Sequence, residues 1–373
     1  LTAPPPPLPR PPLTAPPPPR SPVTAPPPPL SRPPAAPVAA PPIAHAADDP
    51  AGYRFLYQHF ERKGDRDGAY RAALCLEALG EADINESLLV ASSRPEGLQA
   101  IRGTLSYADW NEHLALGASE PETTALLRAL GPALGRVGFQ YARRQRRTLE
   151  PPAETRQQLD TSTTTLARTL QWASRLLCVP ASELVVLPEL VGTLGLLPAA
   201  EQPLLACGRA LGSGFSLAEL AFLWARELSF ARPEAAALCY FPSVWELSQL
   251  LEAALAVGGA AGLGGLDTEA KRIASGLKRE VRGAALEALV DATQRFDRGN
   301  LAVRASEFTR AAELVAGRVA LTACGDLELA LGLAERFPRG HVTGPAERRA
   351  DLLRFTVSPQ LGRIRTTLGV ALG

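Results

Sequence analysis

Histidine is scarce in this sequence, and methionine is absent. The 373 residues contain four histidines, which lie far apart in the chain, and no methionine. Because histidine is among the commonest ligands of zinc and other transition metals, this shortage argues against a metal centre. A chain that lacks methionine and begins inside a proline tract is expected to be a fragment or a processed form.

An excess of one charge and a long apolar run are missing as well. The formal net charge is +1, so no overall field directs the chain to nucleic acid or to an anionic membrane. The longest weakly charged stretch, residues 250–266, contains Glu252 and several glycines. It is shorter than the roughly 20 apolar residues that a membrane helix needs. We therefore expect no integral membrane segment and no nucleic-acid partner.

The cysteines follow no metal-binding or disulfide pattern. They are an odd number, five, and none forms a C-x-x-C pair. Cysteines in apolar surroundings, such as Cys178 after Leu176 and Leu177, usually behave as small buried hydrophobic residues. We interpret the cysteines as structural thiols in a reducing compartment, which favours a cytoplasmic location. The five are Cys75, Cys178, Cys207, Cys239 and Cys324.

Residues 1–50 form a proline-rich tail of low sequence complexity. The unit Thr-Ala-Pro-Pro-Pro-Pro recurs at Thr2, Thr14 and Thr24. Such a density of proline predicts extended polyproline II segments without a core, so the tail is expected to be disordered or a semi-rigid spacer. A second interpretation is an interaction motif at Pro7, Pro9 and Arg10, because P-x-x-P beside an arginine suits grooves lined by aromatic residues.

Residues 51–94 are expected to form a helical hairpin. Apolar residues recur at a spacing of three or four from Tyr53 to Phe60, Gly64 marks a turn, and a second helix ends at Gly80. The offsets are similar to those of one tetratricopeptide-type hairpin. A generic pair of helices is the alternative, because a single repeat cannot bury its own faces. Residues 95–159 are expected to be a helical connecting region, in which the arginines at 143–147 form a solvated helix end.

Residues 160–340 are expected to combine helices with a small β-meander, so the predicted fold class is mainly α with a minor β part (α+β). Leu166–Leu177 has amphipathic helical spacing, and the apolar segments at 183–187, 191–197 and 204–211 are typical of strands. Ser216, followed by Glu219 three residues later, predicts a capping box at the start of another helix.

The remainder is predicted to be almost entirely helical. We expect helices over residues 243–257, 268–296 and 305–337, the last with a break near Gly325. Residues 341–373 are expected to be a C-terminal tail with at most a short helix.

The helix that begins at Ser216 carries the most informative pattern. In an H-E-x-x-H helix, two histidines one turn apart reach one zinc ion, and the glutamate acts as general base for the attacking water. The corresponding residues here are Arg226-Glu227-Leu228-Ser229-Phe230. The general-base position keeps its glutamate. Arg226 and Phe230 stand at the two ligand positions, and neither can donate a lone pair to zinc.

The order of these elements resembles the gluzincin metallopeptidases of the CAAX-prenyl-protease and HtpX type. In that family a later helix carries E-x-x-A-D-R, and its glutamate supplies the third zinc ligand. The matching residues here are Glu313-Leu-Val-Ala316-Gly317-Arg318, in which Gly317 replaces the family aspartate. The resemblance covers roughly residues 160–337 and implies a zincin-like helical domain with Glu313 at the third ligand position.

The departures from the family pattern all fall on catalytic positions. Arg226 and Phe230 replace both histidines, and one carboxylate, Glu313, cannot hold zinc alone. The resemblance therefore implies a degenerate peptidase domain with no cofactor, no catalysis and a vestigial general base at Glu227. It also suggests that Arg226 takes the place of the metal and forms an ion pair with Glu313, one cation replacing another.

Three functions are compatible with the sequence. The first is a non-catalytic pseudo-metallopeptidase that acts as a protein-binding or scaffolding module for protein partners. The second is a helical repeat adaptor without peptidase ancestry, which a sheet around Val185 and Leu205 would disfavour. The third is an active metallopeptidase with unorthodox ligands, which would require His113 or His341 at the metal. A phosphate-binding loop is excluded at residues 258–265, because no Lys-Ser/Thr pair follows these glycines.

Overall fold

The computed structural model describes residues 47–373, except 116, 118, 119, 182, 189, 191–193, 261–264, 298, 339 and 341. All of these residues belong to one compact unit, Pro42–Gly373. The interaction motif expected at Pro7, Pro9 and Arg10 lies outside the described residues.

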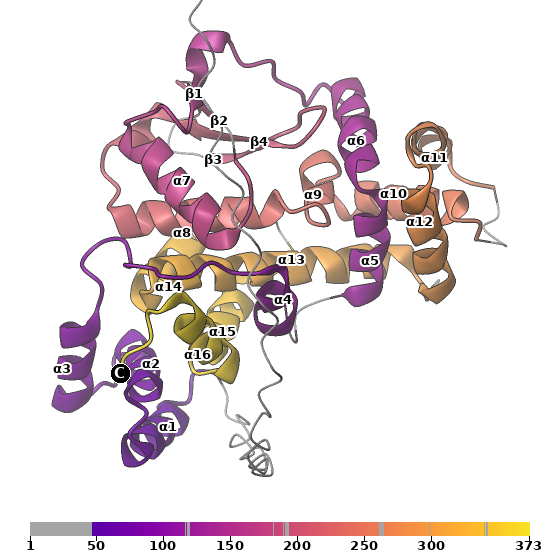
Figure 1. Ribbon diagram of the computed structural model, residues 1–373. Coiled ribbons are helices and arrows are strands. Elements are labelled where there is room, and N and C mark those ends of the chain that lie inside the picture. Colours follow the sequence, from indigo (N-terminus) through magenta and orange to yellow (C-terminus); the bar gives the residue numbers. More distant parts are fainter. Residues whose placement is uncertain are drawn as a thin grey trace, which may run out of the picture. The chain divides into compact units, whose positions relative to one another are not determined.

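The described chain is mainly helical, with one small sheet (Figure 1). The helices are α1 (Pro50–Lys63), α2 (Arg66–Leu79), α3 (Ile84–Ser93), α4 (Tyr107–Asp109), α5 (Pro121–Leu130), α6 (Pro132–Arg144), α7 (Thr165–Leu177), α8 (Leu217–Phe230), α9 (Ala237–Tyr240), α10 (Val244–Val257), α11 (Thr268–Glu280), α12 (Ala284–Arg295), α13 (Leu301–Cys324), α14 (Leu327–Arg336), α15 (Pro345–Thr356) and α16 (Pro359–Leu368). A π-helical turn, η1 (Trp110–Leu114), follows α4, and the 3-10 turns are η2 (Ala153–Thr155) and η3 (Arg209–Gly212).

The sheet is mixed, with the strand order β1-β2-β4-β3. Its strands are β1 (Arg156–Gln158), β2 (Glu183–Leu187), β3 (Leu194–Leu197) and β4 (Leu204–Gly208). The expected meander is therefore wrong in its connectivity, because β2 and β4 pair in parallel and β3 lies outside β4. Burial explains this order: β4 is buried along most of its length and takes a central place, whereas all of β3 is only half-buried and forms an edge. The sequence analysis missed β1, whose three polar residues give no apolar signal.

Two large apolar clusters fill most of the interior, beside a small one on the sheet, and α8 and α13 contribute to both large clusters. The first cluster joins the sheet, α7, the N-terminal hairpin and the C-terminal helices, and it includes Trp224 of α8 and Val319 of α13. The second joins α5, α6 and α10–α12, and it includes Phe230 of α8 and Phe308 of α13. These two helices pack side by side between the clusters (Figure 1). The residues Arg226, Glu227, Phe230 and Glu313 therefore lie on two helices that pack between the two large clusters.

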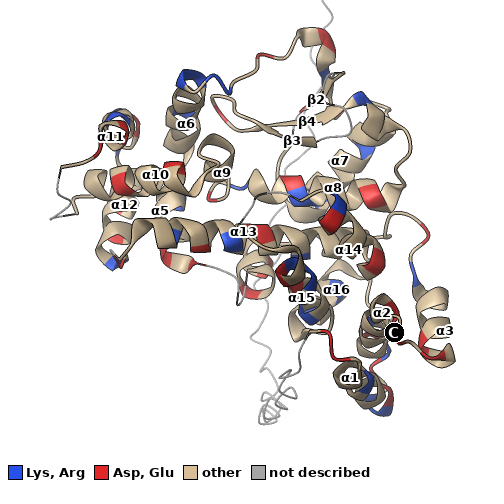
Figure 2. Ribbon diagram, turned by 180° about the vertical axis from the view of Figure 1, so that it is seen from behind, with Lys and Arg blue, Asp and Glu red and all other residues tan. Residues whose placement is uncertain are grey.

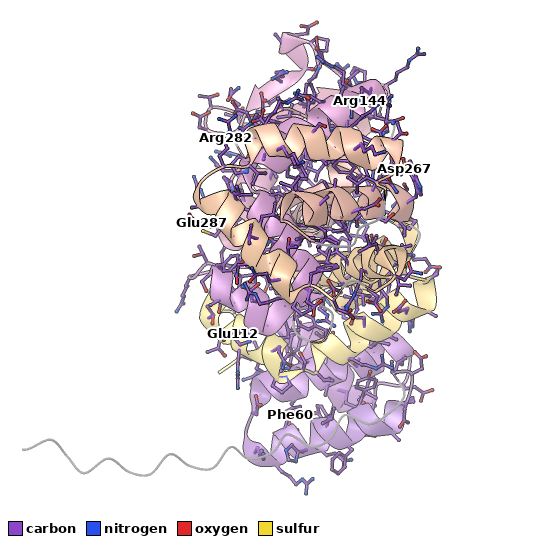
Figure 3. The ribbon with its side chains drawn as sticks, turned by 90° about the vertical axis from the view of Figure 1, so that its right-hand side faces the viewer. Phe60, Glu112, Arg144, Asp267, Arg282 and Glu287 are labelled. Atoms are coloured by element: carbon purple, nitrogen blue, oxygen red, sulfur yellow. The ribbon has the colours of Figure 1, made fainter. Side chains whose placement is uncertain are left out.

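The N-terminal helices form the expected hairpin, and it is docked. Gly64 and Gly80, both in the left-handed region with φ of 68° and 75°, end α1 and α2. Glycine adopts this conformation without steric cost. Helix α2 then packs against α14 and α15. The hairpin, which includes Phe60 (Figure 3), thus buries its inner face against the C-terminal part of the chain.

Two expectations for the C-terminal half need correction. The single helix expected over residues 268–296 is two helices, α11 and α12, because Gly283 has φ of 57° and interrupts the helical backbone. Figure 3 shows this break between Arg282 and Glu287. The expected tail at 341–373 contains two helices, α15 and α16, that bury Leu353 and Ile364 in the first apolar cluster. The break near Gly325 is confirmed, between α13 and α14.

Charges of both signs lie interspersed along the helices (Figure 2). The arginine cluster at the end of α6 is partly tied to neighbouring helices: Arg144 pairs with Glu269 of α11 at 3.3 Å and Arg147 with Glu246 of α10 at 2.7 Å. Within the described residues, every helix is too short or too polar to cross a lipid bilayer.

Candidate functional site

The site that the sequence indicates lies where α8 and α13 pack together. The capping box at the start of α8 is confirmed: the Ser216 backbone N–H donates to Glu219 Oε2 at 2.7 Å, and the Glu219 N–H donates to Ser216 Oγ at 3.2 Å. Farther along α8, Glu227 is 1% exposed, and Glu313 of α13 is 6% exposed. Two carboxylates are therefore buried in this region. We refer to Arg226, Glu227, Phe230 and Glu313 as the vestigial centre.

Arg226, at the first ligand position, is a buried cation. Its guanidinium donates to the carbonyl of Phe337, directly after α14, and its Nη2 lies 3.3 Å from Glu227 Oε1. Burial, together with the smaller effect of the Arg348 charge on α15, lowers the pKa of Arg226 to about 10. Desolvation of a cation disfavours its charged form. The guanidinium is therefore held by one carboxylate and one carbonyl in a place that is costly for its charge.

Glu313, at the third ligand position, is held by the segment between α14 and α15. The backbone N–H of Thr343 donates to Glu313 Oε2 at 3.0 Å, and the Thr343 hydroxyl donates to the same oxygen. Gly340, with φ of 81°, lies so close that a Cβ atom there would overlap Glu313 Oε1. The carboxylate is thus covered by main chain on one side and hydrogen-bonded on the other.

The expected ion pair between Arg226 and Glu313 is not among the ion pairs of the described residues, where the partner of Arg226 is Glu227. The reason is the connection between α14 and α15, which provides Phe337 for the guanidinium and Thr343 for the carboxylate. Arg226 and Glu313, which were expected to pair directly, therefore each contact the same short segment between α14 and α15. The sequence analysis missed it because it falls at the start of the supposed tail.

Phe230, at the second ligand position, is part of the apolar interior. It is 3% exposed and belongs to the same cluster as Phe308 and Ala316 of α13. Ala316 is also one of the residues that match the family motif. An aromatic ring packed in this cluster fills volume and offers no lone pair to a metal.

Arg318, the last residue of the matched motif, finds its carboxylate partner elsewhere. Its Nε and Nη2 donate to Asp351 of α15 at 2.9 and 2.6 Å, and its Nη1 donates to the carbonyl of Leu114 at 2.9 Å. This fork-like pairing is the strong geometry for arginine and a carboxylate. The carboxylate that pairs with Arg318 therefore comes from α15.

No group of three or more His, Cys, Asp or Glu side chains in the described residues is arranged to hold a metal ion. His113 lies in η1, and His341, the other alternative ligand, lies outside the described residues. The five cysteines are free; four are buried and Cys178 is exposed. Glu227 stands at the general-base position, and the guanidinium of Arg226 lies 3.3 Å from its Oε1.

Comparisons with protein-family models, with curated proteins and with solved structures found no match to this chain. The geometry of the vestigial centre is therefore the main guide to function.

Proposed function

We propose that the chain is a non-catalytic metallopeptidase-like protein that acts as a protein-binding or scaffolding module. The observation that supports this most strongly is the filling of both ligand positions on α8. Arg226 is bound to Glu227 and to the Phe337 carbonyl, and Phe230 packs in an apolar cluster. Glu313 alone would leave a zinc ion short of the three protein ligands that catalytic sites use.

The sheet favours this proposal over a helical repeat adaptor. Val185 lies in β2 and Leu205 in β4, and these two strands pair in parallel. A helical array stacks near-identical hairpins and has no place for a four-stranded mixed sheet next to its longest helices. The docked hairpin α1–α2 packs on α3, α14 and α15.

Helix α3 supplies a surface for a protein partner. Ile84 is 79% exposed and Leu88 is 61% exposed. Residues four positions apart lie on the same face of a helix. A pair of large apolar side chains on one exposed helix face is the pattern that partner proteins cover in helix-to-groove and helix-to-helix contacts. We therefore assign the binding role to this end of the hairpin.

Zinc content tests the loss of catalysis. The chain should be purified without a histidine tag and analysed by elemental mass spectrometry, with and without added zinc. We expect no stoichiometric zinc in either sample. About one zinc ion per chain would overturn the proposal, because it would require ligands other than Arg226 and Phe230.

Restoring the ligands tests the ancestry of the site. In the double variant Arg226→His/Phe230→His, two imidazoles one turn apart stand on α8, which packs against α13, the helix of Glu313, and we expect about one bound zinc per chain. The matched control adds Glu313→Gln, which should lose most of this zinc. Absence of zinc from a folded double variant would contradict the proposed relation to zinc peptidases.

The binding role has its own test. Cross-linking of the full chain in cells should capture a protein partner, and Ile84→Ser/Leu88→Ser should remove it. The control is Leu286→Ser/Val303→Ser, which changes exposed apolar residues on α12 and α13. Equal capture by both double variants would exclude α3 as the docking surface.

A further inference from the structure

A half-enclosed cavity of about 290 Å³ lies on the other side of the α8–α13 pair. Its walls come from η1, the start of α5, the end of α8 and the middle of α13. Trp110, Pro121, Phe308 and Val315 give it an apolar lining. The volume stands at the lower end of the range for small-molecule sites, about 300–1,000 Å³. The cavity therefore suits a ligand of roughly the size of one amino acid.

Two arginine side chains that stack on aromatic rings lie on the polar side of this cavity. The ring of Tyr107 contacts two guanidinium groups: Arg128 lies 5.0 Å and Arg232 lies 5.1 Å from its centroid. Arg232 also lies 4.3 Å from the Trp110 centroid. Aromatic rings hold guanidinium groups by cation–π attraction, so both positive charges are fixed in place before any ligand arrives.

Glu234 connects the two arginines, and one of its oxygens has no partner. Its Oε1 lies 2.9 Å from Arg232 Nη2 but 3.9 Å from Arg128 Nη2, which is too long for a hydrogen bond. Glu234 is 9% exposed, and its Oε2 is buried without a hydrogen-bond partner in the described part of the chain. A buried polar atom left in this state costs about 1–3 kcal/mol, so a group that donates to it is favoured.

Arg128, in contrast, is a hydrogen-bond donor that lacks an acceptor in the part of the chain that the structure describes. Its side chain is 41% exposed, and among the described residues its charge meets only the Tyr107 ring and, at 3.9 Å, Oε1 of Glu234. The other carboxylate that lines the cavity is fully engaged, because Glu120 pairs with Arg304 at 2.9 Å and accepts from the Thr123 N–H at 2.6 Å. An adjacent donor and acceptor, Arg128 and Glu234, thus remain for a ligand.

We propose that this cavity binds a free α-amino acid with an apolar side chain. The ligand carboxylate pairs with Arg128, its ammonium pairs with the Glu234 carboxylate, and its side chain lies against Trp110, Phe308 and Val315. An α-amino acid carries its two opposite charges on one carbon, which matches two opposite charges side by side in the protein. Charge-assisted hydrogen bonds of this kind are the strong ones, and they are strengthened in a partly desolvated site.

This site goes beyond the protein-binding role. It does not use Arg226, Phe230 or Glu313, and it does not use the exposed face of α3. The zinc measurements therefore neither support nor oppose it, and failure of one proposal leaves the other intact.

Calorimetric titration of the full chain with L-phenylalanine and L-leucine is the direct test. N-acetyl-L-phenylalanine lacks the ammonium and L-phenylalanine amide lacks the carboxylate, so each is expected to bind at least about tenfold more weakly than L-phenylalanine. The dipeptide glycyl-L-phenylalanine, which separates the two charges, should also bind more weakly. Tighter binding of the dipeptide would overturn the assignment to a free amino acid.

Two variants link the affinity to the residues. Arg128→Gln should bind L-phenylalanine and its amide equally, and Glu234→Gln should bind L-phenylalanine and its N-acetyl form equally. Arg136→Gln, an exposed arginine of α6 outside the cavity, is the matched control and should behave like the wild-type chain. If Glu234→Gln fails to fold, the titrations of Arg128→Gln, a change at a half-exposed residue, are sufficient to test the proposal. Unchanged discrimination in Arg128→Gln, or no binding by the wild-type chain, would overturn the proposal.

Discussion

Asp67 of α2 accepts a hydrogen bond from Arg365 of α16, with Arg365 Nε 2.9 Å from Asp67 Oδ1. Its other oxygen accepts from Arg71 Nε at 3.0 Å, and Oδ1 also accepts from the backbone N–H of Leu372 at 3.1 Å. All three charged residues are buried. One carboxylate thus neutralises two guanidinium groups and ties the N-terminal hairpin to the last helix of the chain.

Asp67→Asn is expected to destabilise the fold by about 3 kcal/mol or more, because it leaves two buried cations without a countercharge. Urea unfolding measures this. The control is Asp291→Asn, which breaks an exposed pair with Arg295 on α12 and should change the unfolding free energy by less than about 1 kcal/mol. Similar decreases in the free energy of unfolding for the two variants would show that the buried cluster stabilises the fold no more than an exposed ion pair does.

Gly340→Ala tests the contact that covers Glu313. Alanine at a φ of 81° is strained, and its Cβ would also overlap the carboxylate. Gly214→Ala is the control, since its φ of 95° brings the same strain but nothing lies within 4 Å of the added Cβ. We expect Gly340→Ala to lower the melting temperature clearly more than Gly214→Ala. When Glu313→Ala is also present, Gly340→Ala and Gly214→Ala should lower the melting temperature by the same amount. A remaining difference would show that the added Cβ at residue 340 clashes with an atom other than the Glu313 carboxylate.

Arg226→Ala should destabilise the chain by about 1–3 kcal/mol, because the carbonyl of Phe337 loses a donor and α8 gains a cavity. Arg226→Met keeps most of the volume without the charge. Since burial lowers the pKa of Arg226 to about 10, the charged form is disfavoured there, and the methionine variant is expected to recover part of the loss. Thermal unfolding compares the two. An Ala variant as stable as the wild type would contradict a structural role for this cation.

Because the thiol of Cys207 in β4 is buried, the free energy of unfolding is expected to fall as the pH becomes alkaline. Burial raises the pKa of its thiol from 9.0 to about 12. Below about pH 9 both states hold the proton and the stabilisation is complete. As the pH rises from about 9 to 12, the unfolded chain ionises first, so stability is lost by up to about 1.4 kcal/mol per pH unit.

Urea unfolding between about pH 8 and pH 11 measures this slope. Cys207→Ala should have a shallower slope than the wild type, although its stability at neutral pH is lower because of the smaller side chain. Cys178→Ala, at an exposed position, serves as control and should keep the wild-type slope. Equal slopes for all three chains would show that the thiol of Cys207 ionises freely in the folded state.

Local signals in the sequence were sufficient for the helices that carry the vestigial centre. The Ser216 capping box, the break near Gly325 and the hairpin turn at Gly64 all depend on residues within a few positions of each other. Such features are encoded by caps and left-handed glycines, which act over one turn. These signals predicted the helices that carry Glu227 and Glu313, whereas the packing of α8 against α13 is a finding of the structure.

What escaped prediction depends on contacts between distant residues. Thr343 and Asp351 could not be assigned to the site, because the link from Asp351 to Arg318 and from Thr343 to Glu313 spans about thirty residues and two helices. The stretch 341–373 has many arginines and little apolar periodicity, so it resembled a tail. Its helices are stabilised by tertiary packing, which propensity alone does not reveal.

The hydrogen bond from Leu372 to Asp67 has a consequence for synthesis of the protein on the ribosome. Asp67 is translated about three hundred residues before Arg365 and Leu372, its partners at the other end. Until those residues leave the exit tunnel, Asp67 has neither of these two partners, and the apolar face of α2 lacks the C-terminal helices that cover it in the folded chain. The nascent hairpin should therefore stay incompletely packed through most of translation, and α1 and α2 should become fully protected only after α16 and Leu372 have emerged.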